Sequence, residues 1–577
     1  MKASPSSGTD WLGAGQVLGS NSAIYGWILL LVVAPNLFLA INSLFIASGG
    51  TIRTQFTLDN YARLFERPTY PLLLIKTLLM GAGAASLATL VAMPLAYFTS
   101  RRVRAKSAVV LLFIVPLWIS LLMRVFAWRI ILGEKGILNS LLQGLHLTTE
   151  PVSWLIYNEY VAVFVMANVV LPYVFVASFV AIDRVPSALL NASVDAGASP
   201  LATFRRITWP LARPGVFVGS ALAFLIAVGD YVTPAMVGGL DGTTIGMLIS
   251  SQFGVAGNWP FGAAIAMLLI LSVSALLGIG FALTRTRGTF EPQTRQEALE
   301  AERPATSGER LREWLSRGGF AFVLLLLYLP LVVMAIFSFN DSTAQSFPFS
   351  GFTLRWYQEA ANNPALLSAL TRSALVSGLT VAIGTIVGTA FALVLARDLV
   401  LSSTLAQSLF SLPVALPGII LGISFAIAFR FLDVGSSLLK VVIGHLTFVT
   451  PVVTLMVLNR LRTMDRDLEY AALDLGSSQT QLLRYVMLPL IRPAIVAGAI
   501  LGFTLSFDEV LVTLFLSASD PTLPIYIWNQ LRFGFTPEIN AVFTVIAGVS
   551  ITSIVIVFTR LNNRAVAGSL TDQGDAG

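Results

Sequence analysis

The sequence predicts an all-α polytopic membrane protein built from two parallel six-helix repeats. Of its 577 residues, 56% are hydrophobic and only 11% are charged, whereas soluble proteins carry about 25% charged residues. Apolar runs of about 20 residues recur along the chain, and each is long enough to cross a ~30 Å hydrocarbon core. One polar stretch also occurs twice, at a constant offset of 279 residues. These observations together predict the fold class and the repeat.

The repeated stretch covers residues 189–214 and 468–493. Each copy is a polar segment between two long apolar runs, so we expect both copies to lie outside the bilayer. A repeat of this length divides the chain into two homologous halves. The paired identities are Leu189/Leu468, Ala192/Ala471, Asp195/Asp474, Gly197/Gly476, Ser199/Ser478, Arg205/Arg484, Pro210/Pro489, Leu211/Leu490, Arg213/Arg492 and Pro214/Pro493.

We expect six membrane helices in each half, about twelve in total, and an even number per repeat gives both halves the same orientation. The first repeat is predicted over 1–284 and the second over 319–577. The predicted helices cover 24–47, 72–99, 108–132, 158–182, 215–238 and 261–284, then 319–339, 368–396, 405–431, 440–459, 494–517 and 540–560.

Two segments outside these helices also carry information. Residues 285–318 are rich in both charge signs, Pro, Gly and Ser, which predicts a flexible, solvated cytoplasmic linker between the halves. The motifs FTLDNY at 56–61 and FTLRWY at 352–357 each follow the first helix of a half. We expect both motifs to form short re-entrant or interfacial pieces on the external side.

The basic residues indicate the orientation of the chain. Arg and Lys gather in the loops that share one side when both termini are cytoplasmic, as the positive-inside rule predicts. The net charge of +6 is therefore a membrane feature and does not indicate nucleic-acid binding. The residues that carry the bias include Arg101, Arg102, Arg104, Lys106, Arg184, Arg205, Arg206, Arg213, Arg460, Arg462, Arg466, Arg484 and Arg492.

Several kinds of chemistry are disfavoured by what the sequence lacks. The chain contains no Cys, which excludes disulfides and thiolate metal sites. Its two histidines, His146 and His445, have no ligand-like neighbours in the sequence, so neither a metal site nor His-based catalysis is expected. No Gly-x-x-x-x-Gly-Lys-[Ser/Thr] phosphate loop occurs. The chain is therefore predicted not to be an ATPase and to have no cofactor of its own.

The start of each repeated stretch reads as a short helix with a small, mildly apolar face. Leu468, Ala471, Ala472 and Leu475 share one helical face, and the first copy has the same phase. We expect each helix to end near Gly197 or Gly476, where glycine adopts a left-handed cap readily. Small residues on an exposed helix indicate close docking of another protein, and the alternative is an amphipathic helix lying on the membrane.

The pattern of Ala, Asp-x-Gly, Arg and Pro-Leu-x-Arg-Pro resembles the EAA loop of permease subunits of ATP-binding-cassette (ABC) importers. In that family the loop forms a coupling helix that sits in a cleft of the ATPase subunit. The family's Glu is replaced by Asn191 in one copy and Tyr470 in the other, and Glu469 lies next to the second position. The resemblance implies ATPase coupling by Ala192, Asp195, Gly197, Ser199, Ala471, Ala472, Asp474, Gly476 and Ser478.

The resemblance extends over nearly the whole chain. GDYVTPAMVGG at 229–239 and SFDEVLVT at 506–513 resemble the fifth-helix motifs of the two permeases of spermidine/putrescine importers. PLWISLLMRVFAWRIIL at 116–132 resembles the third helix of the first of those permeases. The chain thus resembles both permeases fused into one polypeptide with the type I importer fold.

This resemblance implies a multi-pass protein of the bacterial inner membrane that moves a small solute. Its implied partners are two copies of a cytoplasmic ATPase, which bind ATP and Mg, a periplasmic or extracellular solute-binding protein, and membrane lipid. A polyamine or similar organic cation is the expected substrate. The alternatives within the class are an opine, an aminophosphonate or iron. An ion-coupled secondary transporter would show inverted repeats, and a channel or scaffold would explain neither the duplicated loop nor the buried acids.

Acidic residues in apolar runs are candidates for the substrate pathway, because burying charge in lipid is expensive. Asp230, Asp508 and Glu509 are such residues, and Asp230 and Glu509 correspond at the offset of 279. Pro234 is expected to break its helix nearby. Trp128, Tyr231, Phe507 and Tyr173 could present aromatic faces to an ammonium group. The alternative is structural pairing of the acids with Arg124, Arg129 or Arg430, and Arg124 is also a pathway candidate.

Overall fold

The structure is a computed structural model that describes residues 22–48, 51–284, 307–343, 349–396, 410, 413, 416–517, 520–533 and 536–552. Nine helices in these ranges are long and apolar enough to cross a membrane. A bent pair of helices and two shorter apolar helices, Gly418–Phe431 and Glu538–Thr552, occupy the remaining predicted segments. The described residues therefore confirm an all-α polytopic fold. Its strand content is one short ribbon, formed by β1 (Ile46–Ser48) and β2 (Thr51–Arg53).

The third helix of the first half is bent, whereas the sequence predicted one continuous helix. It consists of α5 (Lys106–Ile114), the 3₁₀ turn Val115–Trp118 and α6 (Leu121–Leu132), and the two arms meet at 85°. Pro116 lies at the bend. Its ring lacks the N–H that a continuous helix needs and obstructs the preceding turn, so the helix changes direction there.

The first helix of the second half begins earlier than predicted. Helix α15 spans Ser307–Phe337, so residues 307–318 of the predicted linker are helical, and residues 285–306 lie outside the described ranges. Proline is absent between Ser307 and the predicted helix start at 319, and Leu, Arg and Glu favour helix there. Residues 307–318 of the predicted linker therefore continue directly into the membrane helix.

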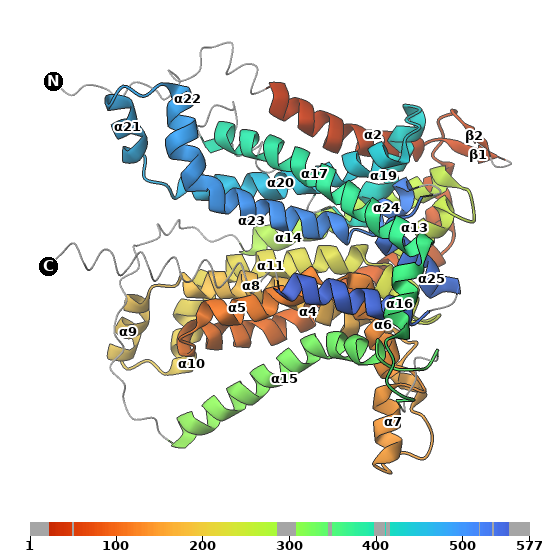
Figure 1. Ribbon diagram of the computed structural model, residues 1–577, viewed down its shortest axis with the longest axis horizontal. Helices are drawn as coiled ribbons and strands as arrows, with labels where there is room; N and C mark the ends of the chain where they lie inside the picture. The colour runs from red at the N-terminus through yellow and green to blue at the C-terminus, as the bar shows by residue number, and fades with distance from the viewer. Residues whose placement is uncertain are drawn as a thin grey trace. The chain divides into compact units, whose positions relative to one another are not determined.

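The contacts divide the chain into two compact units. The first unit comprises residues 1–68, 248–270 and 364–529. Its core is α17 (Pro364–Ala396), α20 (Ser437–Arg462) and α23 (Leu488–Phe507), which pack side by side (Figure 1). Helix α2 (Ala34–Asn42), from the first half of the sequence, packs on α19 (Gly418–Phe431).

The second unit comprises residues 69–247, 271–363 and 530–577. Its core is α4 (Thr69–Arg102), α8 (Glu159–Asp183) and α11 (Trp209–Gly229), and α15 packs on α6. Each core thus comes from one half of the sequence, whereas further segments of each unit come from the other half. The units therefore do not follow the predicted repeat boundaries at 284 and 319, which remain a prediction about the sequence.

Small residues allow the core helices of the second unit to approach closely. A Cβ placed at Gly219 of α11 would lie 2.6 Å from the Cβ of Ala177 of α8. At Gly81 of α4 it would lie 2.4 Å from a methyl carbon of Val228. Close contact of backbones through Gly and Ala is the usual way in which helices associate in lipid. These glycines therefore fix the spacing of the three helices.

The two FTL-x-x-Tyr motifs form the same local structure. Each motif leads into a short helix whose tyrosine hydroxyl bonds a serine at the end of the preceding helix, Tyr61 to Ser43 at 2.7 Å and Tyr357 to Ser338 at 2.8 Å. The hydroxyl bond holds each short helix against the end of the first helix of its half. The predicted interfacial location remains a prediction. The short helices are α3 (Asp59–Glu66) and α16 (Arg355–Asn362).

Candidate functional site

The first copy of the repeated stretch folds into two short helices joined by a tight turn. Helix α9 spans Ser187–Asp195. Gly197, two residues after its last residue, turns the chain with a φ of +77°. The N–H of Gly197 donates to Val194 O at 2.9 Å and that of Ala198 donates to Ser193 O at 3.0 Å. This pair of bonds is the Schellman ending, which favours glycine at the left-handed position. The predicted left-handed cap is therefore observed.

The second copy repeats this ending. Helix α21 (Asp467–Asp474) ends at Gly476 with φ +80°. The Gly476 N–H donates to Leu473 O at 2.7 Å, and the Ser477 N–H donates to Ala472 O at 3.1 Å. The same turn therefore occurs in both copies, and in both it redirects the chain toward the fifth helix.

A serine begins the next short helix in both copies. Ser199 Oγ accepts from the Ala202 N–H at 3.3 Å, at the start of α10 (Pro200–Thr203). Ser478 Oγ accepts from the Gln481 N–H, and Gln481 Oε1 accepts from the Ser478 N–H at 2.8 Å. This reciprocal arrangement is a capping box. The serines retained in the repeat therefore have a local role in shaping the turn.

The fifth helix runs directly out of each repeated stretch, which corrects the predicted helix starts at 215 and 494. A π turn, Phe204–Thr208 or Leu482–Met487, leads into α11 or α23 without interruption. Pro214 and Pro493 then lie inside these helices. Tight packing of α11 on α8 and of α23 on α20 compensates for the backbone bond that each proline removes.

Both stretches expose large apolar side chains. Val194 and Leu201 are 56% and 66% exposed in the first copy, and Leu475 is 89% exposed in the second. Exposed apolar surface on an otherwise polar segment is typical of a site that a partner covers. Among the predicted docking residues, Ala472 is half-buried, and the others are exposed: Ala192, Asp195, Gly197, Ser199, Ala471, Asp474, Gly476 and Ser478.

The interiors of the two stretches differ in polarity. In the first copy the buried hydroxyls of Ser193 and Thr203 bond each other. At the matching positions the second copy has Ala472 and Leu482, which join an apolar cluster with residues of α20. The two turns therefore have the same backbone but are stabilised by different side-chain contacts.

The positions of the family's glutamate are also informative. Asn191 and Tyr470 are both exposed, so a partner could reach them. Glu469, which the sequence offered as a substitute, is only 7% exposed. Neighbouring residues of a helix point about 100° apart. Glu469 therefore faces the interior while Tyr470 faces outward. Glu469 therefore does not supply the exposed charge.

The fifth helix of the first half breaks at Asp230. Helix α11 ends at Gly229, and α12 (Val232–Val237) begins after Asp230 and Tyr231. Asp230 is 4% exposed, and its Oδ1 accepts from the Thr233 N–H at 2.9 Å while Oδ2 bonds the Thr233 hydroxyl. The break lies four residues before Pro234, the position whose carbonyl a helical proline obstructs. The break is therefore displaced from Pro234 itself, which lies inside α12.

Buried polar and aromatic residues surround this break in the second unit. Arg124 is 5% exposed, donates to Val169 O at 3.5 Å and interacts electrostatically with Asp230. Trp128 is 2% exposed, and its indole N–H donates to Asn168 Oδ1 at 3.2 Å. Of the other predicted aromatics, Tyr231 is buried and Tyr173 is half-buried. The two bonds from Thr233 support a structural role for Asp230, and the pathway roles of Asp230 and Arg124 remain predictions.

The fifth helix of the second half breaks at the matching place. Helix α23 ends at Phe507, and α24 (Leu511–Leu516) begins after Asp508, Glu509 and Val510. Glu509 Oε1 accepts from the Val512 N–H at 2.9 Å, as Asp230 does from Thr233. Both Asp508 and Glu509 are half-buried, and Phe507 stacks on Phe503 with ring centroids 5.6 Å apart. Asp230 and Glu509 therefore cap the short helix that follows each break.

The second break has an additional polar bridge that the sequence analysis missed. His445 of α20 is 1% exposed, and its Nδ1 lies 2.8 Å from Ser506 Oγ while its Nε2 lies 2.9 Å from Thr513 Oγ1. Ser506 precedes the break and Thr513 follows it. The imidazole therefore joins the two parts of the interrupted helix. The residues at the offset of 279 in the first half, Met166, Ala227 and Pro234, cannot make this bridge.

Together the two units present duplicated turns with exposed apolar faces and duplicated helix breaks with buried acids. The breaks place carboxylates and irregular backbone among the packed helices, which membrane proteins tolerate where such groups are enclosed or line a cavity. Each feature occurs once in each unit.

Comparison with known proteins gives the family. Residues 384–568 match the family described as binding-protein-dependent transport system inner membrane component. The spermidine/putrescine transport system permease protein PotB of Escherichia coli strain K12 is 32% identical over 256 residues, which cover 44% of this chain and 92% of PotB. The corresponding PotC of Haemophilus influenzae is 32% identical over 251 residues, covering 43% and 97%.

A third relative belongs to the same class. The inner membrane ABC transporter permease protein YdcU of Escherichia coli strain K12 is 29% identical over 255 residues, which cover 42% of this chain and 79% of YdcU. Each relative spans less than half of this chain, whereas the chain covers most of each relative. The chain therefore belongs to the permeases of binding-protein-dependent ABC importers, as a multi-pass inner-membrane protein that resembles two such subunits fused into one.

Proposed function

We propose that this permease imports a small organic cation, with putrescine or spermidine as the first candidates. The names of the relatives PotB and PotC support a polyamine. The acids Asp230, Asp508 and Glu509 at the two helix breaks support a cationic substrate, because carboxylates attract ammonium groups. An opine, an aminophosphonate or iron would be carried by the same architecture and is the alternative.

We propose that two copies of a cytoplasmic ATPase drive transport by docking on the two repeated stretches. The observation that carries this proposal is the duplicated turn with its exposed apolar face, including Leu201 in the first copy and Leu475 in the second. The ATPase would supply the ATP and Mg sites. Because both docking stretches lie on one chain, a single copy of the permease would serve both ATPase subunits.

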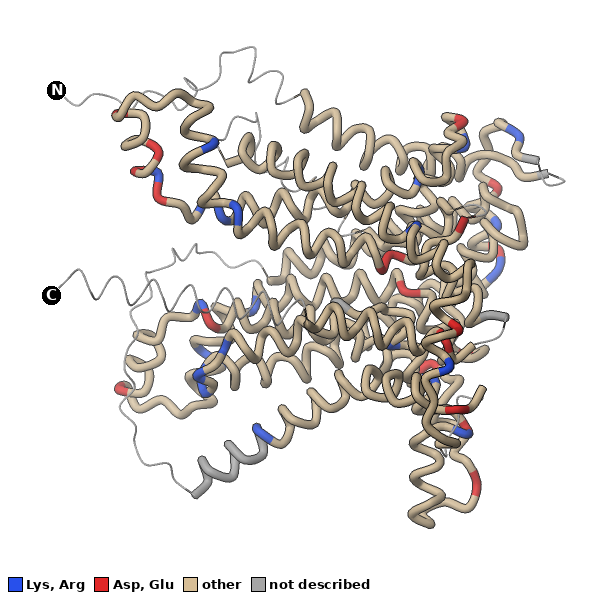
Figure 2. Tube along the Cα trace, viewed as in Figure 1, with Lys and Arg blue, Asp and Glu red and all other residues tan. Residues whose placement is uncertain are grey.

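We propose that both termini and both repeated stretches face the cytoplasm. Most Lys and Arg residues lie near helix ends in each unit (Figure 2), and those around the repeated stretches agree with the positive-inside rule. The opposite ends of the helices would then face the external solute-binding protein. ATP-driven closure of the ATPase pair would move the two repeated stretches and shift the permease between outward and inward openings.

Reconstitution with a ligand panel tests this function. The chain would be placed in lipid with its ATPase and binding protein, and ATP hydrolysis would be measured with putrescine, spermidine, an opine, an aminophosphonate and ferric iron. Stimulation by polyamines supports the proposal, and stimulation by another ligand alone changes the substrate. Gradient-driven uptake by the chain without any ATPase would contradict the proposed mechanism. Leu475→Asp, which places charge on the docking face, is expected to abolish stimulation.

A further inference from the structure

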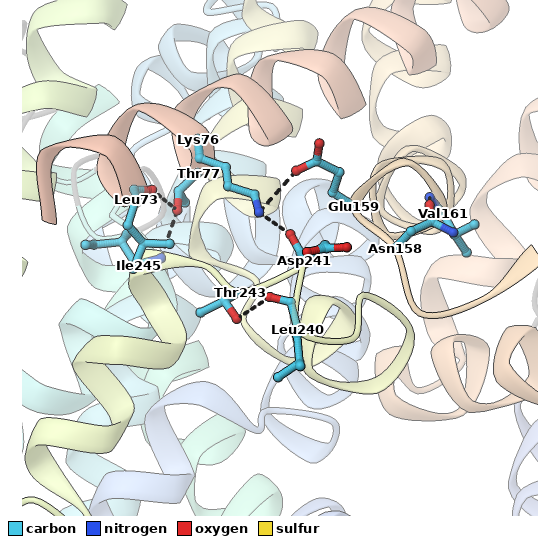
Figure 3. A network of polar contacts seen from close by, with 10 residues as sticks. All are labelled: Leu73, Lys76, Thr77, Asn158, Glu159, Val161, Leu240, Asp241, Thr243 and Ile245. Carbon is cyan, nitrogen blue, oxygen red and sulfur yellow. Dashed lines mark hydrogen bonds and ion pairs between the residues drawn. The ribbon is translucent and has the colours of Figure 1, made fainter. Parts of the chain in front are cut away.

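The loop after the first helix break is tied to the start of α4 by a lysine (Figure 3). Lys76 donates from Nζ to the backbone oxygen of Asp241, in the loop formed by residues 238–244. The same Nζ lies 3.1 Å from Glu159 Oε2, at the first position of α8. Lys76 therefore joins three segments: the second helix of the half, the fourth helix and the loop beyond the break.

The residue after Lys76 adds a second bond to the same loop. Thr77 is 2% exposed, and its Oγ1 accepts from the Ile245 N–H at 2.8 Å while it donates to Leu73 O at 2.8 Å (Figure 3). Ile245 begins α13 (Ile245–Phe253). The first N–H groups of a helix have no partner within the helix, so the threonine satisfies one of them from outside.

The second half contains the same joint. Arg372 of α17 lies 3.2 Å from Asp520 Oδ2, in the loop after the second break, and its Nη2 donates to Ser437 Oγ at the start of α20 at 3.1 Å. The next residue, Ser373, accepts from the Leu523 N–H at 2.8 Å. Leu523 begins α25 (Leu523–Phe533). A cation followed by a hydroxyl residue therefore holds the corresponding loop in both units.

The two joints connect the same three segments but use different partners for the cation. Lys76 pairs with an acid from the fourth helix and bonds a loop carbonyl, whereas Arg372 pairs with an acid from the loop and bonds a helix hydroxyl. The charge partner has thus moved from helix to loop. Both units therefore share the link between the second helix, the fourth helix and the loop, although the bonded groups differ.

The first loop needs an external tether because its own backbone is permissive. It contains Gly238, Gly239 and Gly242, and Gly239 has φ +60°. Glycine-rich segments are conformationally free. A Cβ at Gly239 would lie 2.7 Å from the backbone oxygen of Tyr157, so the loop lies directly against the chain before α8. Leu240 at its tip is 94% exposed.

We propose that Lys76 and Arg372 are matched positioning residues that fix the segment after each fifth-helix break to the second helix of the same unit. The segment carrying each break then moves together with that helix. The Lys76 and Glu159 side chains are 31% and 36% exposed, so the joint can open locally. The consequence for transport rests on the proposed function, whereas the tether itself does not.

A spin label on the loop tests the tether directly. The chain has no cysteine, so Leu240→Cys gives a single labelling site at an exposed position. Lys76→Met is expected to raise the mobile fraction of the label about fivefold, the shift that loss of a partly exposed ion pair can produce. Lys76→Arg should keep the wild-type spectrum, and Lys135→Met, an exposed lysine in the same unit, is the matched control.

The second measurement separates positioning from the proposed function. In reconstituted complexes, Lys76→Met and Asp520→Asn should each lower ligand-stimulated ATP hydrolysis about fivefold while the basal rate stays unchanged. An unchanged label spectrum in Lys76→Met overturns the tether. A mobile loop with full stimulation supports the tether and overturns its consequence for transport. If the wild-type complex shows no stimulation by any ligand, the proposed function fails, and the label spectrum alone then decides the tether.

Discussion

The two fifth-helix breaks have the same geometry but are held by different side chains. In the first half the acid is almost fully buried and bonds both the N–H and the hydroxyl of Thr233. In the second half Glu509 is half-buried and bonds one N–H, that of Val512. His445 then bridges the two sides of the second break.

The presence or absence of a proline explains the difference. Pro234 cannot donate to the carbonyl of Asp230, so the first helix is interrupted by covalent structure. The second half has Thr513 at the matching position, and threonine could continue a helix. There the interruption depends on hydrogen bonds from His445 and Glu509. The first break is therefore expected to be rigid, and the second to respond more to changes in side chains.

The largest expected effect comes from removing the buried acid of the first break. Asp230→Ala leaves the buried Thr233 N–H and hydroxyl without their acceptor, and each hydrogen bond to a charged group contributes about 1.5–3 kcal/mol. Asp230→Asn keeps an acceptor for the Thr233 N–H and should cost less. The free energy of unfolding in mixed micelles distinguishes the two variants. Equal losses would contradict the distinction between charge and cap.

The next largest effect is expected at the bridge of the second break. His445→Ala leaves the buried hydroxyls of Ser506 and Thr513 without the imidazole, and each unsatisfied group costs about 1–3 kcal/mol. The triple change His445→Met, Ser506→Ala and Thr513→Val, which makes the site apolar like the first half, should recover much of that loss. Thermal unfolding in lipid nanodiscs measures both. A triple variant less stable than His445→Ala would refute the bridge.

A smaller effect is expected for the acid of the second break. Glu509→Gln retains an oxygen that can accept from the Val512 N–H, and Glu509 is half-buried. The free energy of unfolding should therefore change by about 1 kcal/mol or less. Ligand-stimulated ATP hydrolysis should nevertheless fall if the negative charge attracts the substrate. Unchanged stability with lost stimulation places Glu509 on the pathway. Full stimulation would assign it to capping alone.

A further effect on stability is expected in the repeated stretches, where the same contrast of polar and apolar contacts recurs. Ser193→Ala removes one member of the buried Ser193–Thr203 pair and should destabilise the first unit by about 1–2 kcal/mol. Adding Thr203→Leu reproduces the Ala472 and Leu482 pair of the second copy and should restore stability. Thermal unfolding of the single and double variants is the test, and a double variant below the single one would contradict it.

The repeat and the ends of α9 and α21 could be predicted from local sequence. Gly197 and Gly476 stand where a Schellman ending needs a left-handed residue, and both adopt it. The long apolar runs also predicted the membrane helices well. Pro234 also predicted a break nearby, and the helix breaks at Asp230, because a helical proline disturbs the carbonyl four residues earlier.

Contacts between distant residues could not be predicted. His445 bonds residues 61 and 68 positions away, and nothing near it in the sequence marks it as polar-bonded. Trp128 was a candidate for binding a cation, yet its indole donates to Asn168, which lies 40 positions away. The joints at Lys76 and Arg372 could not be predicted from the repeat. These two residues are 296 positions apart, so they do not align at the offset of 279.

Crosslinking at the two repeated stretches tests the central proposal most directly. In the cysteine-free chain, Ala192→Cys and Ala471→Cys would be introduced singly and together, and each would be crosslinked to the co-expressed ATPase in the membrane. We predict one ATPase subunit attached through each position and two per chain in the double variant. Crosslinking at only one position, or at neither, would contradict the proposal that an ATPase subunit docks on each repeated stretch.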